Sequence, residues 1–264
     1  MDFDFCFLVL SCDKNARLLD IFLDQLFINM DVKIKTYIMM EELEVIDSRV
    51  VSLRTGKKPW SDRLETALTL ITEKNVILIC DDDIVETKMA MDELKRLSDK
   101  MIEDNTIGNI MLTEIIGKSK KETLCDNYLL RDHYGRYKTA LQVGIWNKEF
   151  LKRITVKGES PWEFETFSNI RSFTEYYKCY ALKSNKYKPI SYNDGFFVIQ
   201  GKVFKKERER LEQVLLKDMK VDGMDEWEEE PVRDNIRFIP RVLRRLKIMV
   251  LYAKFYFEAK MLHI

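Results

Sequence analysis

Histidine is nearly absent from this chain, whose 264 residues include only His133 and His263. Two imidazoles are too few for a histidine-based zinc site, or for a Ser-His-Asp triad with a residue to spare. The five cysteines form no Cys-x-x-Cys pair. An odd number of cysteines without close spacing is typical of proteins whose thiols stay reduced. The sequence therefore gives no basis for a zinc site or a disulfide framework.

Excess charge and long apolar runs are absent as well. The 44 basic residues equal the 44 acidic ones, so the molecule lacks the positive charge that favours nucleic-acid binding. No stretch approaches the roughly 18 uninterrupted apolar residues of a membrane span. The N-terminus, Asp2-Phe3-Asp4, has no basic region and predicts no signal peptide. These absences predict a cytoplasmic protein that does not bind nucleic acid.

Three consecutive aspartates, Asp81, Asp82 and Asp83, follow the apolar run 75–80. A short run of this kind predicts a strand buried on both faces. Its carboxyl end then lies at the sheet edge where open α/β folds bind ligands. Because successive residues of an extended chain point to opposite sides, Asp81 and Asp83 are expected to face one space and Asp82 the other.

Adjacent carboxylates repel one another, and a bound cation relieves that repulsion at a partly dry edge. Oxygen ligands suit Mg²⁺ or Mn²⁺, and such an ion completes its shell with phosphate oxygens. The aspartates therefore predict a metal and phosphate site. The alternative is a solvated acidic turn that caps the following helix.

The segments before the aspartates alternate between strand and helix patterns. Strands are predicted over 5–10, 32–40 and 45–53, and helices over 19–30 and 61–71. Such alternation predicts an α/β domain with a parallel sheet covered by helices.

The segments after the aspartates continue this pattern less regularly. A helix over 90–101 and a short helix over 149–154 are predicted, with strands over 107–116, 139–146, 176–182 and 196–199. Residues 118–137 are polar and aperiodic, which predicts a long loop or a short excursion over the site. Trp146 and Trp162 are aromatic residues that are expected to wall that site.

A cluster of glutamates marks a second informative stretch. Ser160, Pro161 and Glu163 form a helix-start signature, in which Glu163 closes a capping box. The positive end of the helix would also stabilise a carboxylate acting as a base. Capping and catalysis are both open for Glu163, and Glu159, outside the helix, is freer to reach a substrate.

The character of the chain changes near residue 205, which predicts a domain over 1–205 and a helical C-terminal extension over 206–264. Within 233–264, eight basic residues stand against two acidic ones, on a pattern with one apolar helical face. A basic amphipathic helix with aromatic residues is a candidate for binding the inner face of the cell membrane. The alternative is a helix that docks on its own domain or on a second copy of the chain.

Five segments, in this order, resemble bacterial glycosyltransferases of the GT-A fold. Members of this kind (family-2-like) assemble surface polysaccharides such as capsule and O-antigen, and the likeness covers about the first 205 residues. The segments are Leu8–Asp13, Trp60–Leu64, Asp81–Asp83, Gln142–Trp146 and Glu159–Glu165.

The resemblance implies a Rossmann-like mixed sheet flanked by helices, and an enzyme that transfers a sugar with inversion. The donor would be a nucleoside-diphosphate sugar and the acceptor a hydroxyl of a glycan or a lipid-linked molecule. Asp81 and Asp83 would hold Mn²⁺ or Mg²⁺, and Glu163 or Glu159 would activate the acceptor. The residues implied to bind the nucleotide are Ser11, Asp13, Arg63, Asp81 and Asp82.

Three other functions compete with this interpretation. A haloacid-dehalogenase-like phosphohydrolase also places Asp-x-Asp after an apolar strand, with the first aspartate as nucleophile. A nucleotidyltransferase would need a glycine-rich loop after the first strand, where this chain has Cys12–Asn15. A non-catalytic membrane-docking or scaffolding subunit would act through the basic tail.

Overall fold

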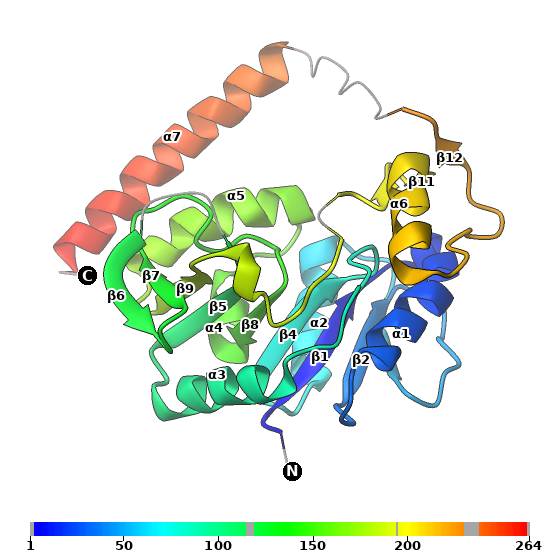
Figure 1. Ribbon diagram of the computed structural model, residues 1–264. Helices are drawn as coiled ribbons and strands as arrows, with labels where there is room; N and C mark the ends of the chain where they lie inside the picture. The colour runs from blue at the N-terminus through cyan, green and yellow to red at the C-terminus, as the bar shows by residue number, and fades with distance from the viewer. Residues whose placement is uncertain (1–2, 115–118, 194, 230–237, 263–264) are drawn as a thin grey trace.

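The computed structural model describes residues 3–114, 119–193, 195–229 and 238–262 (Figure 1). Its centre is a nine-stranded sheet of order β3-β2-β1-β4-β8-β5-β9-β7-β6. The strands are β1 (Phe5–Leu10), β2 (Thr36–Met40), β3 (Val51–Arg54), β4 (Asn75–Cys80), β5 (Ile107–Glu114), β6 (Ser119–Leu124), β7 (Tyr128–Arg131), β8 (Gly144–Asn147) and β9 (Lys178–Leu182).

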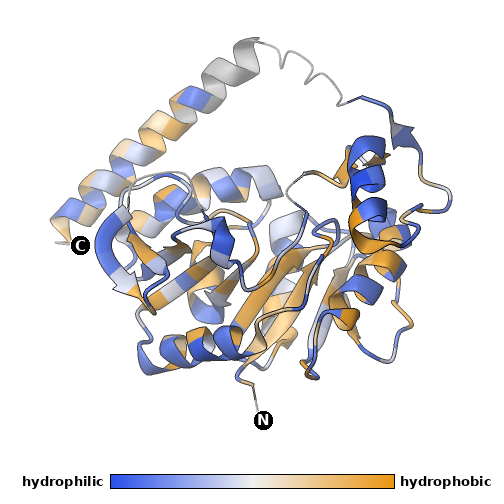
Figure 2. Cartoon of the chain, in the orientation of Figure 1, coloured by the Kyte–Doolittle hydropathy of each residue, from blue (hydrophilic) through white to orange (hydrophobic). Residues whose placement is uncertain are grey.

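The first four strands form a parallel block with the order β3-β2-β1-β4. β1 is buried along its whole length and β4 up to Ile79, and in Figure 2 the hydrophobic colour is concentrated on the central strands. From β1 the chain adds β2 and β3 on one side and then returns to add β4 on the other side. This reversal of the winding between β1 and β4 is typical of a doubly wound fold. Ligands of such folds bind at that reversal, outside the carboxyl ends of the strands.

Helices cover both faces of the sheet. α1 and α3 share one hydrophobic cluster with the strands, and α2, α4 and α5 share a second cluster on the other face. Their bounds are α1 (Leu19–Ile28), α2 (Trp60–Leu70), α3 (Met91–Glu103), α4 (Lys148–Ile154) and α5 (Pro161–Arg171), with short 3₁₀ helices η1 (Asp13–Leu18), η2 (Ser172–Thr174) and η3 (Asn185–Tyr187). The predicted α/β class, a mixed sheet flanked by helices in a GT-A-like arrangement, is confirmed.

β8 makes the sheet mixed, because it runs antiparallel to both β4 and β5. The strand predicted over 139–146 starts at Gly144, after a bend. A Cβ on Gly144 would lie 3.1 Å from Met111 Sδ and 3.2 Å from Ile110 O. The close approach of β5 therefore favours a glycine where β8 begins.

The long loop predicted over 118–137 is instead largely a hairpin, so that prediction was wrong. β6 and β7 pair antiparallel at the end of the sheet farthest from β3, and Cys125 and Asp126 turn between them with positive φ angles of 50° and 64°. β7 is mostly buried, but the edge strand β6 is almost wholly exposed. Its sequence therefore carries no hydrophobic period that could identify it.

A small second sheet follows the first. It contains β10 (Val198–Ile199), β11 (Lys202–Phe204) and β12 (Glu226–Trp227), with α6 (Lys205–Leu215) between β11 and β12. The predicted boundary at 205/206 lies at the start of α6. Val203, Leu211 and Met219 join the cluster that contains β1 and α1, so side chains from both sides of this boundary pack in that cluster.

α7 (Phe238–Met261) runs along the outside of the molecule (Figure 1). It contacts α5 and η2. Arg233 and Arg237 of the predicted basic segment lie outside the described residues. Within the part of the chain that the structure describes, no helix combines the length and the apolar character that a membrane crossing requires.

Candidate functional site

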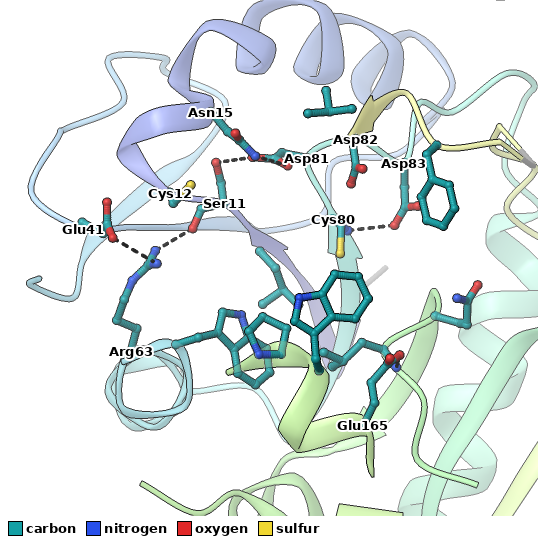
Figure 3. A pocket seen from close by; sticks show the side chains of 18 of the residues that line it. Ser11, Cys12, Asn15, Glu41, Arg63, Cys80, Asp81, Asp82, Asp83 and Glu165 are labelled. Atoms are coloured by element: carbon teal, nitrogen blue, oxygen red, sulfur yellow. Dashed lines mark hydrogen bonds and ion pairs between the residues drawn. The ribbon is translucent and has the colours of Figure 1, made fainter. Parts of the chain in front are cut away.

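A cavity of about 760 Å³ opens at the carboxyl ends of β1 and β4, where the winding of the sheet reverses (Figure 3). The first group of lining residues comes from the strand exits. The second comes from α2 and the loop before it, from α5, and from the segments at 141–142 and 196–198. They are Leu10, Ser11, Cys12, Asn15, Glu41, Cys80, Asp81, Asp82 and Asp83, followed by Lys58, Trp60, Arg63, Leu141, Gln142, Pro161, Trp162, Glu165, Phe196 and Val198.

Asp81 connects the exits of the two central strands. Its Oδ2 accepts a 2.6 Å hydrogen bond from Ser11 Oγ, and its Oδ1 accepts one of 3.2 Å from Asn15 Nδ2. The Asp81 amide also donates to Leu10 O at 3.3 Å. The side chain is 3% exposed, so Asp81 is fixed against η1 and the end of β1.

The alternation predicted for the three aspartates was wrong, because β4 ends at Cys80 and the aspartates begin a turn. The amide of Asp83 donates to Cys80 O at 3.1 Å, and Asp83 Oδ2 accepts from Cys80 N at 2.9 Å. In Figure 3, Asp81 points toward Ser11 and Asn15, while Asp82 and Asp83 lie side by side. Asp82 therefore lies with Asp83 at the cavity, and does not face away from it.

Burial and mutual repulsion make the three carboxyl groups weak acids. Burial, with the charge of Asp82, raises the pKa of Asp81 to about 7, although hydrogen bonds from Ser11 and Asn15 act to lower it. Burial raises the pKa of Asp82 to about 6. Burial and the charge of Asp82 raise the pKa of Asp83 well above its ordinary value. A cation at this cluster would favour the charged forms.

The segment after the aspartates is tied to the chain that leads to β10. Val85 and Tyr192 form an isolated antiparallel bridge, and Ile84 N donates to Asn193 Oδ1 at 2.5 Å. The Asn193 amide returns a 3.1 Å hydrogen bond to Ile84 O. These contacts connect the acidic turn with the segment carrying Phe196, which lines the cavity and is 56% exposed.

Arg63 and Asp13 mainly organise the strand exits. The Arg63 guanidinium is buried and donates to Ser11 O at 2.5 Å, Met39 O at 3.4 Å and Thr55 Oγ1 at 3.2 Å. The carboxylate of Asp13 accepts from the backbone amides of residues 41–43 at 3.0–3.3 Å. Ser11 and Arg63 line the cavity, whereas Asp13 is not among its described lining residues.

The two glutamates expected to act as a base are engaged elsewhere. Glu163 closes a capping box, because its Oε2 accepts from Ser160 N at 3.0 Å and Ser160 Oγ at 2.8 Å. Glu159 forms a two-pronged ion pair with Arg171 at 2.8 and 2.7 Å. Neither is among the described residues that line the cavity. Of the two roles left open for Glu163, capping and catalysis, its contacts support capping.

Glu165, which the sequence interpretation passed over, lines the cavity from α5. Its Oε1 accepts a 2.8 Å hydrogen bond from Leu141 N. Trp162 lines the cavity as well and is 69% exposed. Residues three apart share a helix face, so the spacing of Trp162 and Glu165 was the signal that could have identified the glutamate.

Other predictions about the cavity wall are also corrected. Trp146 is fully buried and stacks on Phe150 in the core, and the hairpin of β6 and β7 supplies none of the described lining residues. The walls instead include Trp60, which packs edge-on against Phe164, and Lys58. Gln142 lies at the cavity, in the bend before β8.

The charge of the cavity is predominantly acidic. Among the described lining residues, the aspartates, Glu41 and Glu165 stand against Lys58 and Arg63, and the Arg63 guanidinium is already bound to backbone carbonyls. Within the described residues, no group of three or more histidine, cysteine or acidic side chains is arranged to hold a metal ion by itself. The described wall thus carries more carboxylates than cations.

Comparisons with known proteins give a distant likeness only. No protein-family model and no curated protein matches the chain. The crystal structure of Staphylococcus aureus TarS 1–349 in complex with UDP is 11% identical, with a TM-score of 0.47 over 80% of this chain and 64% of that one. A cytidylyltransferase from Leptospira borgpetersenii is 11% identical, with a TM-score of 0.43 over 71% of this chain and 78% of that one.

A second TarS 1–349 structure is 13% identical with a TM-score of 0.45, and this chain spans 59% of its length. The chain thus spans less than two-thirds of these TarS fragments. Values of this size decide neither substrate nor reaction, and the function proposed below rests on the cavity.

Proposed function

We propose that the protein is a metal-assisted glycosyltransferase. It moves a sugar, with inversion, from a nucleoside-diphosphate sugar to a hydroxyl of a glycan or a lipid-linked acceptor. The observation that carries this proposal is the position of the three aspartates, at the winding reversal between β1 and β4 and in the wall of a cavity of about 760 Å³. Both size and location suit a nucleotide ligand.

Asp82 and Asp83 are the side chains that would hold Mg²⁺ or Mn²⁺. Both line the cavity, and carboxylate oxygens are the ligands these ions prefer. Two carboxylates are enough, since Mg²⁺ in nucleotide sites usually takes its other ligands from phosphates and water. The bound ion would neutralise the departing diphosphate. Asp81 takes a different part, because its contacts with Ser11 and Asn15 hold the turn in place.

The nucleoside would lie against the exit of β1. The cavity is lined there by Ser11, Cys12 and Asn15. The guanidinium of Arg63 donates a hydrogen bond to the Ser11 carbonyl and so fixes its position. Lys58 is exposed at the cavity and is the lining cation with a side chain accessible to a phosphate. These polar residues would contact the nucleotide of the donor, and the aromatic residues of the cavity wall would remain available for a sugar.

The acceptor would enter on the side of α5. Figure 3 places Glu165 on the α5 side of the cavity, across from the labelled aspartates on the β4 side. A base positioned there would take the proton of the acceptor hydroxyl as the new bond forms. Trp162 presents an exposed ring at the same wall, and the apolar face of a sugar can stack on it. Glu165 therefore replaces Glu163 and Glu159 as the proposed base.

The competing functions have weaker support. A phosphohydrolase would need the Asp81 carboxylate free to attack phosphorus, but both of its oxygens accept hydrogen bonds from Ser11 and Asn15. A nucleotidyltransferase would cradle a triphosphate in a glycine-rich loop, whereas residues 13–18 form η1 without glycine. A non-catalytic subunit would have no use for carboxylates crowded at a cavity.

Thermal unfolding with UDP, GDP or CDP, each with and without Mn²⁺, tests the proposal. A nucleotide at 100 times its Kd is expected to raise the melting temperature by about 5 °C. The rise should require Mn²⁺ and should be lost in Asp82→Asn, which keeps the size of the side chain. Exposed Asp218→Asn is the matched control. If none of these nucleoside diphosphates shifts the melting temperature in the presence of Mn²⁺, the proposal fails.

A further inference from the structure

α7 carries two apolar faces, and the first packs on the domain. Ala259 is fully buried together with Phe173 of η2, and Phe255 packs against the same cluster. Tyr252 meets the Phe173 ring edge-on at 5.3 Å between centroids, and Tyr256 lies 5.0 Å from Tyr134. This face docks the helix on α5 and η2, so the other side of α7 is turned away from the domain.

The second apolar face is exposed. Leu246 is 52% exposed, Val250 67% and Phe257 65%. Side chains at this three-to-four-residue spacing line one side of a helix. We call this set the outer stripe of α7, and its members are Leu246, Met249, Val250, Ala253, Phe257 and Met261. A helix of 24 residues extends roughly 36 Å, so the stripe follows most of its length.

Positive charge accompanies the outer stripe. Arg245, Lys254 and Lys260 are exposed, and Lys260 lies over the rings of Tyr134 and Tyr256 at 5.3 and 5.8 Å. Glu258 is the one acidic residue in the sequence from 245 to 262, and it is partly buried. The exposed side of this segment thus combines apolar side chains with cations.

We propose that the outer stripe of α7 binds the surface of an anionic lipid bilayer. An apolar helix face flanked by lysine and arginine lies in the plane of the interface, with the apolar side chains among the acyl chains and the cations at the headgroups. α7 does not have the composition of a membrane span. The inner face meanwhile keeps the helix attached to α5, so binding brings the whole domain to the membrane.

The charges favour lipid over a second copy of the chain. Two stripes packed against each other would bring Arg245, Lys254 and Lys260 close to the same cations of the partner. Paired helices normally place opposite charges beside their apolar seam, and the described part of the stripe has no exposed carboxylate beside it. An anionic headgroup layer supplies the missing negative charge.

Co-sedimentation of the full chain with vesicles tests this proposal. The protein is expected to bind vesicles of phosphatidylcholine and phosphatidylglycerol at low salt, and to bind vesicles of phosphatidylcholine alone far less. Phe257→Glu should weaken binding about ten-fold or more. Lys254→Gln should weaken it about five-fold, and high salt should weaken it in the same direction.

Ile46→Glu is the matched control, because Ile46 is 96% exposed and lies outside α7. It should bind as the unaltered chain does, and unchanged melting temperatures should establish that all variants are folded. Absence of binding to anionic vesicles would overturn the proposal, and so would binding that Phe257→Glu leaves intact. A dimer in solution that Phe257→Glu dissociates, without lipid binding, would assign the stripe to self-association instead.

Discussion

The hydroxyl of Ser11 donates a 2.6 Å hydrogen bond to Oδ2 of Asp81, and so joins the exit of β1 to the exit of β4. Seventy residues separate the partners in sequence. Both side chains are buried, so neither end of the bond is freely solvated. The position of the acidic turn over the cavity depends on this contact.

Ser11→Ala is expected to lower the free energy of unfolding by about 1–3 kcal/mol, because it leaves a buried carboxyl oxygen without its donor. Chemical denaturation with urea measures the change. Thr69→Ala removes an exposed hydroxyl that bonds within α2, and should cost no more than about 0.5 kcal/mol. Equal effects of the two substitutions would contradict the role given to Ser11.

The stability of the metal-free protein should depend on pH through the aspartates. Burial raises the pKa of Asp82 from 3.8 to about 6 and that of Asp81 to about 7. The folded state therefore binds more protons than the unfolded state in this range, and their contribution to stability declines as pH rises through these values.

Urea denaturation in EDTA, from pH 4.5 to 7.5, compares the unaltered chain with Asp82→Asn. The unfolding free energy of the variant should gain on that of the unaltered chain as pH rises, and Mn²⁺ should reduce the difference. A difference that does not vary with pH would show that these carboxyl groups are not perturbed as described.

Glu165→Gln should separate catalysis from binding. The amide keeps an oxygen to accept from Leu141 N, but it cannot take a proton, so the transfer rate should fall by about 10²–10⁴-fold. Calorimetry should find donor affinity unchanged. Glu163→Gln is the matched control, because glutamine also closes a capping box, and its rate should stay near that of the unaltered chain. The reverse ranking would return the base to Glu163.

Trp162→Ala should weaken the acceptor and spare the fold. The ring is 69% exposed, so its loss should change stability by no more than about 0.5 kcal/mol. Loss of a stacked sugar should raise the KM for the acceptor about ten-fold, with little change in donor affinity. Tyr187→Ala, at a 51% exposed ring outside the described cavity wall, should alter neither constant.

The sequence predicted the central part of the fold because burial imposes strong patterns there. The run 75–80 predicted a buried strand, and the helix periods over 19–30 and 90–101 predicted α1 and α3 to within two residues. The edge strand β6 was not predicted, and the bounds predicted for β3 were shifted, since a strand exposed on one side needs few apolar residues. The aspartates were identified because they directly follow the apolar run of β4, but the directions of their side chains were not predicted.

The directions of side chains depend on where a strand stops, and apolar pattern does not define that residue. One residue beyond Cys80 the chain turns, which moved Asp82 to the cavity. Glu163 and Glu165 differ similarly. The capping signature was correct and fully occupies Glu163, whereas Glu165 is oriented by Leu141, in the bend before β8. The contact with Leu141 leaves no local signal, so the sequence indicates Glu165 only through its spacing from Trp162 on α5.

The buried guanidinium of Arg63 has a consequence for mutational screens. It satisfies carbonyls from the ends of two neighbouring strands and a threonine from the end of a third. Lysine has no fork and cannot replace these bonds. Loss of activity in variants of residue 63 would thus reflect a disrupted sheet edge. A screen that scores protein abundance together with activity would distinguish this cause from the loss of a substrate contact.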